Sequence, residues 1–221
     1  MGTRRSYDEV CAVAHALDLV GERWALLIVR ELLLGPKRFT DLRHSLVSIS
    51  PNVLTQRLTE LEAACVVTKR KLPSPAASWV YELTPWGQQL EPVIKALACW
   101  GVRSPIRPHE GRLSLDSLML SFRVTFDAPK AADFRARVEL RLGDDVFHVA
   151  MGDGEVAVGR GPASEPDAVL ELTPPTLAAL VYGGRDLSDA IATGEVRVLG
   201  DAAIARRWLT LFSVPEAVAA R

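Results

Sequence analysis

The sequence contains only three cysteines, at positions 11, 65 and 99, and no two of them form a Cys-x-x-Cys pair. Their odd number and wide spacing indicate neither a disulfide framework nor a zinc site. No apolar run approaches the roughly 18 residues of a membrane span, and the first residues lack the apolar core of a signal peptide. We therefore expect a cytoplasmic protein with reduced thiols and no membrane contact.

Motifs of catalysis are also missing. The sequence has no His-Glu-x-x-His, no Gly-x-Ser-x-Gly and no phosphate-cradling Gly-x-x-x-x-Gly-Lys, which are the patterns of zinc hydrolases, serine hydrolases and nucleotide-binding loops. We predict a protein that is not an enzyme and that carries no metal and no cofactor.

What the chain does contain is enough apolar sequence, 48% of 221 residues, to bury a sizeable core. Its net charge of −1 hides an asymmetry. Residues 1–108 carry 14 Lys and Arg against 10 Asp and Glu, and residues 109–221 carry 12 against 17. A mildly basic half followed by an acidic half favours one surface that meets an anionic partner.

The first half has a helical period. It predicts amphipathic helices over residues 10–20 and 22–34, a short helix capped by Thr40, and a helix that starts at Ser50 with Pro51 in its first turn. Two extended runs, 66–72 and 79–83, then predict a hairpin, and a long helix follows from Thr84 to about residue 102. Short helices of which the last three directly precede a hairpin are the order of a winged helix-turn-helix.

In that order the Ser50 helix is the one that enters the major groove of DNA, with its N-terminus near a phosphate. Amides pair with adenine and arginine pairs with guanine, so its exposed polar residues can read bases. We predict phosphate contacts from the hairpin, which is called the wing in this fold, and from the helix that precedes the Ser50 helix. The alternative is that the charge run of the hairpin is only a solvated surface, as short charge runs usually are. The predicted DNA-binding residues are Arg38, Arg43, Ser50, Asn52, Thr55, Gln56, Arg57, Lys69, Arg70 and Lys71.

A proline-rich linker at residues 105–111 separates two predicted domains, 1–104 and 112–221. After the linker the apolar period changes to two. It predicts strands over 122–126, 136–142, 146–151, 155–159, 168–172 and 195–199, with helices that begin near Thr173, Asp186 and Asp201. The predicted architecture is an α+β domain with an antiparallel sheet and helices on one face.

Residues 11–101 resemble the HxlR-type transcriptional regulators. The matching stretches are CAVAHALDLVGERW (11–24), ELLLGPKRFTDL (31–42), ISPNVLTQRLTELE (49–62) and YELTPWG (81–87). The resemblance implies a homodimer, with contacts from the N-terminal segment and from the helix that carries Trp86 and Trp100. It also makes Cys11 a candidate sensor of oxidants or electrophiles; the alternative is a small buried residue in the dimer seam. Cys65 and Cys99 lie on apolar helix faces, which predicts core packing.

Residues 112–215 resemble sterol-carrier-type lipid-binding domains through DAVLELTP (167–174), LAALVYG (177–183) and AIATGEVRVLGD (190–201). This resemblance implies a pocket for an apolar ligand, although the same aromatic residues would equally form a solid core. The candidate lining residues are Phe122, Phe126, Phe147, Tyr182, Trp208 and Phe212.

The leading hypothesis is a homodimeric regulator that binds a pseudo-palindromic operator in double-stranded DNA. A lipophilic effector in the second domain, or oxidation of Cys11, would modulate its binding to DNA. The competing hypothesis is a lipid carrier whose helical domain serves protein contacts.

Overall fold

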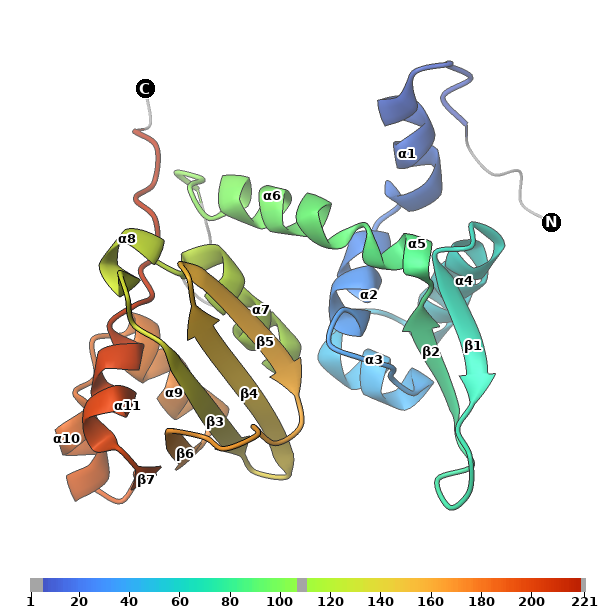
Figure 1. Ribbon diagram of the computed structural model, residues 1–221. Coiled ribbons are helices and arrows are strands. Elements are labelled where there is room, and N and C mark those ends of the chain that lie inside the picture. Colours follow the sequence, from blue (N-terminus) through green and yellow to red (C-terminus); the bar gives the residue numbers. More distant parts are fainter. Residues whose placement is uncertain (1–5, 107–110, 220–221) are drawn as a thin grey trace. The chain divides into compact units, whose positions relative to one another are not determined.

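The computed structural model describes residues 6–106 and 111–219, which form two compact units, Met1–Ala96 and Leu97–Arg221 (Figure 1). Four residues of the predicted linker, 107–110, lie outside the described residues. The predicted domain limits, 1–104 and 112–221, stay a prediction.

The first unit is mainly helical and ends in a two-stranded hairpin followed by a short helix (Figure 1). Helix α6 (Glu91–Gly101) begins in this unit and ends in the second. The other elements are α1 (Ala12–Val20), α2 (Ala25–Leu32), α3 (Phe39–Ser45), α4 (Pro51–Ala63), β1 (Val67–Lys71), β2 (Trp79–Leu83) and α5 (Pro85–Gln88).

The core of this unit forms where the apolar faces of α2 and α4 meet. Ile28 and Leu32 of α2, and Leu54, Leu58 and Leu61 of α4, are each at most 1% exposed. Their spacing of three and four residues places them on one side of each helix, as the helical period predicted. Burial of one face of α4 leaves its opposite face to solvent.

Two sequence predictions for this unit are wrong in detail. The helix predicted from Thr84 to residue 102 is two helices, α5 and α6, with Gln89 and Leu90 between them. Thr84 caps α5, because its Oγ1 accepts a hydrogen bond from Gly87 N at 2.9 Å. The cap of α3 is Arg38 rather than Thr40, because Asp41 Oδ2 accepts the Arg38 N–H at 2.9 Å.

The second unit is a five-stranded sheet with helices packed against it. Its strand order is β5-β4-β3-β6-β7. The elements are α7 (Leu115–Thr125), α8 (Ala128–Ala131), β3 (Ala136–Leu142), β4 (Asp145–Gly152), β5 (Glu155–Arg160), β6 (Ala168–Leu172), α9 (Pro174–Tyr182), α10 (Leu187–Ala192), β7 (Val196–Gly200) and α11 (Ala202–Leu209).

The prediction of an antiparallel sheet is wrong, because β3 and β6 pair in parallel and the sheet is mixed. After β5 the chain does not continue the meander. Residues 161–167 cross the polar face of the sheet, where Ala163 N donates to Glu139 Oε2 at 2.9 Å and Asp167 N donates to Arg137 O at 2.9 Å. The chain therefore enters β6 beside β3 and in the same direction.

The strand predicted over 122–126 is also wrong, since these residues belong to α7 and its end. Ser114 caps this helix by accepting Ser117 N at 3.1 Å. The buried residues Leu118, Met119 and Phe122 repeat at helical spacing, and this repeat outweighs the local alternation of Phe122, Val124 and Phe126.

Candidate nucleic-acid interface

Helix α4 presents a polar face to solvent. Ser50 caps the helix by accepting Val53 N at 3.3 Å, and Pro51 occupies its first turn, where no N–H is needed. Asn52, Thr55 and Gln56 are exposed, opposite the buried leucines. The helix therefore carries two amides and a hydroxyl on one accessible surface.

Local hydrogen bonds orient two of these side chains. Thr55 Oγ1 donates to Pro51 O at 2.9 Å, and Gln56 Nε2 donates to Glu60 Oε1 at 3.0 Å, one helical turn further on. Asn52 lies in the first turn of α4, where a major-groove reader makes its base contacts.

Arg57 does not belong to this surface, which corrects the prediction that it is exposed. It is 8% exposed, and its guanidinium forms an ion pair with Glu60 and a second with Glu22 at 3.5 Å. Arg57 therefore links α4 to the segment that precedes α2. Its position beside Leu58 on the helix places it at the edge of the core.

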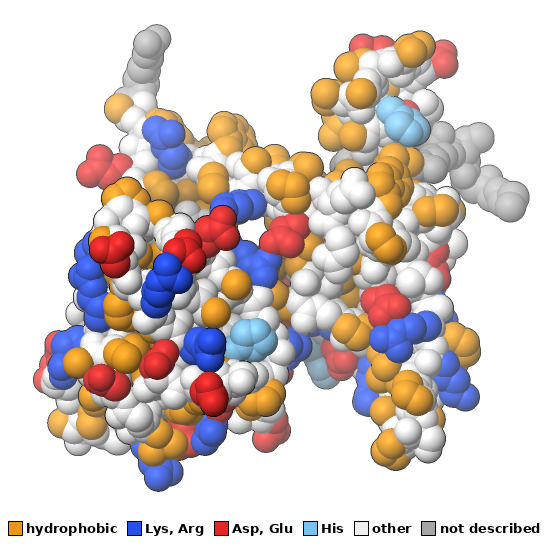
Figure 2. All heavy atoms as spheres, viewed as in Figure 1, with side chains coloured by type: hydrophobic (Ala, Val, Ile, Leu, Met, Phe, Trp, Pro, Cys, Tyr) orange, Lys and Arg blue, Asp and Glu red, His pale blue; other side chains and the backbone are white. Residues whose placement is uncertain are grey.

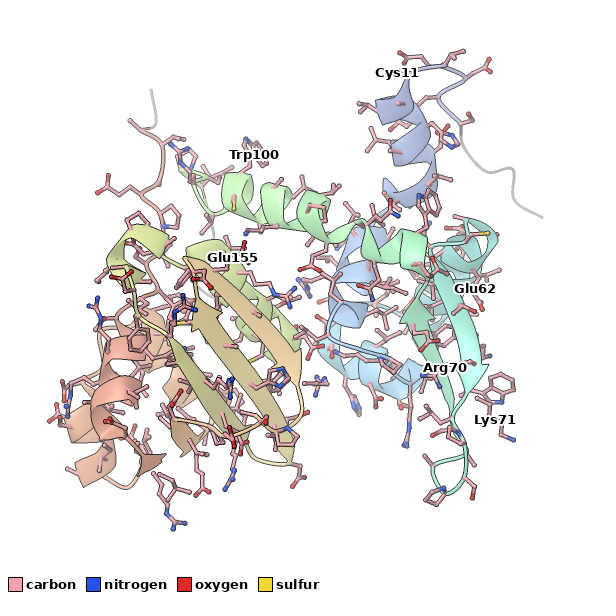
Figure 3. The ribbon with its side chains drawn as sticks, viewed as in Figure 1. Cys11, Glu62, Arg70, Lys71, Trp100 and Glu155 are labelled. Carbon is pink, nitrogen blue, oxygen red and sulfur yellow. The ribbon has the colours of Figure 1, made fainter. Side chains whose placement is uncertain are left out.

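The predicted backbone contacts are exposed as expected. Arg38 caps α3, Arg43 lies in the last turn of α3, and Lys69, Arg70 and Lys71 lie on β1 (Figure 3 labels Arg70 and Lys71; Figure 2 shows the exposed Lys and Arg side chains in blue). Arg70 differs from the others because its charge is compensated by a carboxylate: its Nε lies 2.7 Å from Glu82 Oε2.

A buried ion pair, which sequence reasoning missed, holds the wing in place. Glu31 is fully buried, and its carboxylate receives Lys37 Nζ at 2.7 Å and Arg30 Nη2 at 2.8 Å. Lys37 also forms a β-bridge with Tyr81, with N···O distances of 3.0 and 2.8 Å. The signal in the sequence was a glutamate within the apolar run of α2.

The three thiols occupy different environments. Cys11 is exposed just before α1, where the N–H groups of Ala14 and Val13 lower the pKa of its thiol. Cys65 is exposed after the end of α4, at φ 56°, so the prediction that it packs in the core is wrong. Cys99 is partly buried. Arg4 and Arg5, two cations close to Cys11 in the sequence, lie outside the described residues.

Apolar side chains are exposed on α1 and on α6. Val13 and Leu17 of α1 are 66% and 43% exposed, and Trp100 of α6 is 79% exposed (Figure 3 labels Trp100). Trp86 is 47% exposed and lines an apolar cavity of about 210 Å³ together with Leu19 and Leu90. Exposed apolar residues on neighbouring turns of one helix are typical of an interface.

In the second unit, the aromatic residues predicted to line a pocket contact one another. The Phe122 ring lies 5.4 Å from Trp208 and 4.6 Å from Phe212, and Phe126 lies 6.2 Å from Phe212, between ring centroids. Phe147 is fully buried, and the Arg160 guanidinium lies 4.5 Å from its centroid. These rings form packed contacts of a core.

Tyr182, the sixth predicted lining residue, has a hydroxyl 2.7 Å from Ser121 Oγ and 2.9 Å from Thr125 Oγ1. Burial raises the pKa of this phenol, and the two hydroxyl contacts oppose the rise. Its hydroxyl therefore ties α9 to α7.

Within residues 6–106 and 111–219 no group of three His, Cys, Asp or Glu side chains is arranged to hold a metal ion. No helix in the same residues is long and apolar enough to cross a bilayer.

Helices α2, α3 and α4, the two-stranded wing and the exposed polar face of α4 define a winged helix-turn-helix protein. Residues 19–107 match the family described as HxlR-like helix-turn-helix, and residues 110–218 match the family described as alkyl sulfatase C-terminal. The uncharacterized HTH-type transcriptional regulator YvaP of Bacillus subtilis is 36% identical over 94 residues, which are 42% of this chain and 87% of YvaP. The chain belongs to the HxlR-like helix-turn-helix family.

Two further similar proteins each match less than half of this chain. The HTH-type transcriptional regulator YodB of Bacillus subtilis is 36% identical over 85 residues, 38% of this chain and 76% of YodB. The solved structure of a double mutant of the sec-alkyl sulfatase PisA1 matches with a TM-score of 0.43 and 21% sequence identity. The match covers 48% of this chain and 17% of the PisA1 chain.

The position of Arg57 yields a prediction. Arg57→Met removes both ion pairs and keeps an unbranched side chain, so we expect the free energy of unfolding to fall by about 1–3 kcal/mol. Urea denaturation measures this change. Gln56→Met, at the exposed neighbouring position, is the matched control and should change the free energy by less than about 0.5 kcal/mol. Equal stability of Arg57→Met and the unchanged chain would contradict the structural role.

Proposed function

We propose that this helix-turn-helix regulator binds double-stranded DNA with sequence specificity and acts as a homodimer in the cytoplasm. The observation that carries the proposal is the exposed face of α4, where Asn52, Thr55 and Gln56 stand opposite a buried leucine seam. An amide side chain pairs bidentately with adenine in the major groove, which is wide enough to admit a helix.

The cations around α4 supply the part of binding that does not depend on sequence. Arg38 at the start of α3, Arg43 within α3 and the lysines of β1 would neutralise phosphates on either side of the groove. The N-terminus of α4 adds main-chain N–H groups, with Ser50 as its cap. Arg57 is left out of the proposed contacts because its charge is already paired.

A homodimer accounts for the apolar surface of the helices. Val13 and Leu17 on α1, and Trp100 on α6, would leave water if they packed against a second copy. A second copy packed on α1 would also cover the cavity beside Trp86. Two copies would then meet half-sites about one or two helical turns apart on a pseudo-palindromic operator.

Fluorescence anisotropy with a duplex from the region upstream of the chain's own gene tests this function. We expect sequence-selective binding that weakens steeply with salt, at two chains per duplex. Gln56→Ala should reduce the preference for that duplex over a scrambled one, by about 5- to 100-fold. Lys71→Ala should weaken binding to both duplexes alike. Absence of binding even at low salt would refute the function and leave the lipid-carrier hypothesis.

The thiol of Cys11 is proposed as a sensor of oxidants or electrophiles. A lowered pKa increases the thiolate fraction at neutral pH, and the thiolate is the reactive form. The side chain is also exposed, so a reagent can reach it.

In a chain with Cys65→Ser and Cys99→Ser, the rate of Cys11 alkylation should rise with pH around a lower midpoint in the folded state than in urea. The difference arises because the N–H groups of Ala14 and Val13 lower the pKa only while α1 is folded. Equal midpoints would contradict the lowered pKa. For sensing itself, an electrophile should weaken DNA binding by the unchanged chain and leave Cys11→Ser unaffected.

The second unit is proposed to be a non-catalytic domain, sterol-carrier-like in fold, that holds a lipophilic effector. Because its aromatic rings contact one another, an effector would have to separate α7 from α11 to reach the interior. Native mass spectrometry of the full chain with long-chain fatty acids and alcohols tests the proposal. A bound ligand that Phe122→Trp excludes supports it, and a ligand-free spectrum at every concentration refutes it.

A further inference from the structure

One face of the wing carries lysines against aromatic rings. In the hairpin register, Lys69 pairs with Tyr81 and Lys71 pairs with Trp79. Cross-strand partners and alternate residues share a face, so these four side chains lie together. Lys69 Nζ is 5.4 Å from the centroid of the Trp79 ring and 5.5 Å from that of Tyr81.

The opposite face of the wing has a different charge. Arg70 lies there, on the other side of β1 from Lys71 (Figure 3), and its Nε is 2.7 Å from Glu82 Oε2. The positive charge of Arg70 is therefore compensated. In the part of the chain that the structure describes, no carboxylate forms an ion pair with Lys69 or Lys71. One face is thus cationic, and the other is close to neutral.

The exposure of Trp79 is the second observation. Its side chain is 55% exposed on the hairpin, although tryptophan buries more apolar area than any other residue. Trp79 lies on the same face of β2 as Tyr81 and Leu83, which pack at the core, but it is further toward the tip of the hairpin and remains exposed. A large ring beside two unpaired cations fits a partner that offers both phosphate charge and an apolar edge, and the sugar–phosphate backbone of duplex DNA offers both.

We propose that the wing contacts DNA through its Lys69–Trp79 face, and that Arg70 serves the hairpin instead. This inference rests on the proposed function and assigns the residues of its wing contact. The two rings restrict the rotamers of Lys69 before DNA arrives, so less side-chain entropy is lost when its ammonium meets a phosphate. Trp79 packs its free edge against a deoxyribose of the same strand and excludes water from that contact.

The test is fluorescence anisotropy of the full chain on a mixed-sequence duplex of about 30 base pairs, titrated over a range of salt concentrations. Lys69→Gln should lower the slope of log K against log salt by about 1. Trp79→Ala should weaken binding about 3- to 10-fold, and Trp79→Phe should restore part of the loss. Arg70→Gln is the matched control, one residue along the same strand, and should leave the slope unchanged.

The outcomes separate the two proposals. If the unchanged chain does not bind at low salt, the proposed function fails. If it binds, and Lys69→Gln keeps the full slope while Arg70→Gln lowers it, the wing assignment alone is overturned. Urea denaturation shows whether each variant still folds. If Trp79→Ala unfolds the hairpin, the result for Lys69→Gln decides the question, because Lys69 is exposed.

Discussion

The arrangement of the DNA-binding unit depends on one buried carboxylate. Glu31 has no access to water, and a buried anion is costly unless cations and hydrogen bonds compensate it. Lys37 provides that compensation at 2.7 Å, and its backbone pairs with Tyr81 of β2. The carboxylate on α2 therefore anchors the residue whose main chain pairs with β2. Since α2 also packs on α4, the same ion pair relates the wing to the proposed reading helix.

Charged residues of one type have different tasks in this unit. Arg57 and Arg70 have carboxylate partners and hold elements together, whereas Lys69 and Lys71 have none among the described residues. Composition does not predict this difference, because an arginine that pairs with a carboxylate across two strands and an arginine that contacts a phosphate are the same residue type. It follows from which carboxylates the fold brings within reach.

The second unit shows the same division between local and distant constraints. Its helix caps are local: the side chains of Thr173, Asp186 and Asp201 each accept main-chain N–H groups from the second or third residue that follows, as their sequences predicted. The strand order, by contrast, is not set by local residues. Glu139 is 4% exposed because residues 161–167 cross over it, and that crossing places β6 beside β3. An alternating pattern predicts a strand, but it does not specify a neighbour.

Local sequence patterns predicted most helices and strands, the caps of α4, α5, α9, α10 and α11 but not that of α3, the polar face of α4 and the family of the first unit. These depend on residues within about four positions of one another, or on motifs read directly. Only the tertiary structure decided that residues 122–126 complete a helix, that the sheet is mixed, and that Arg57 is buried while Cys65 is exposed. The parallel pairing of β3 with β6 and the burial of Arg57 beside Glu22 depend on contacts between segments far apart in the chain, and local patterns do not contain that information.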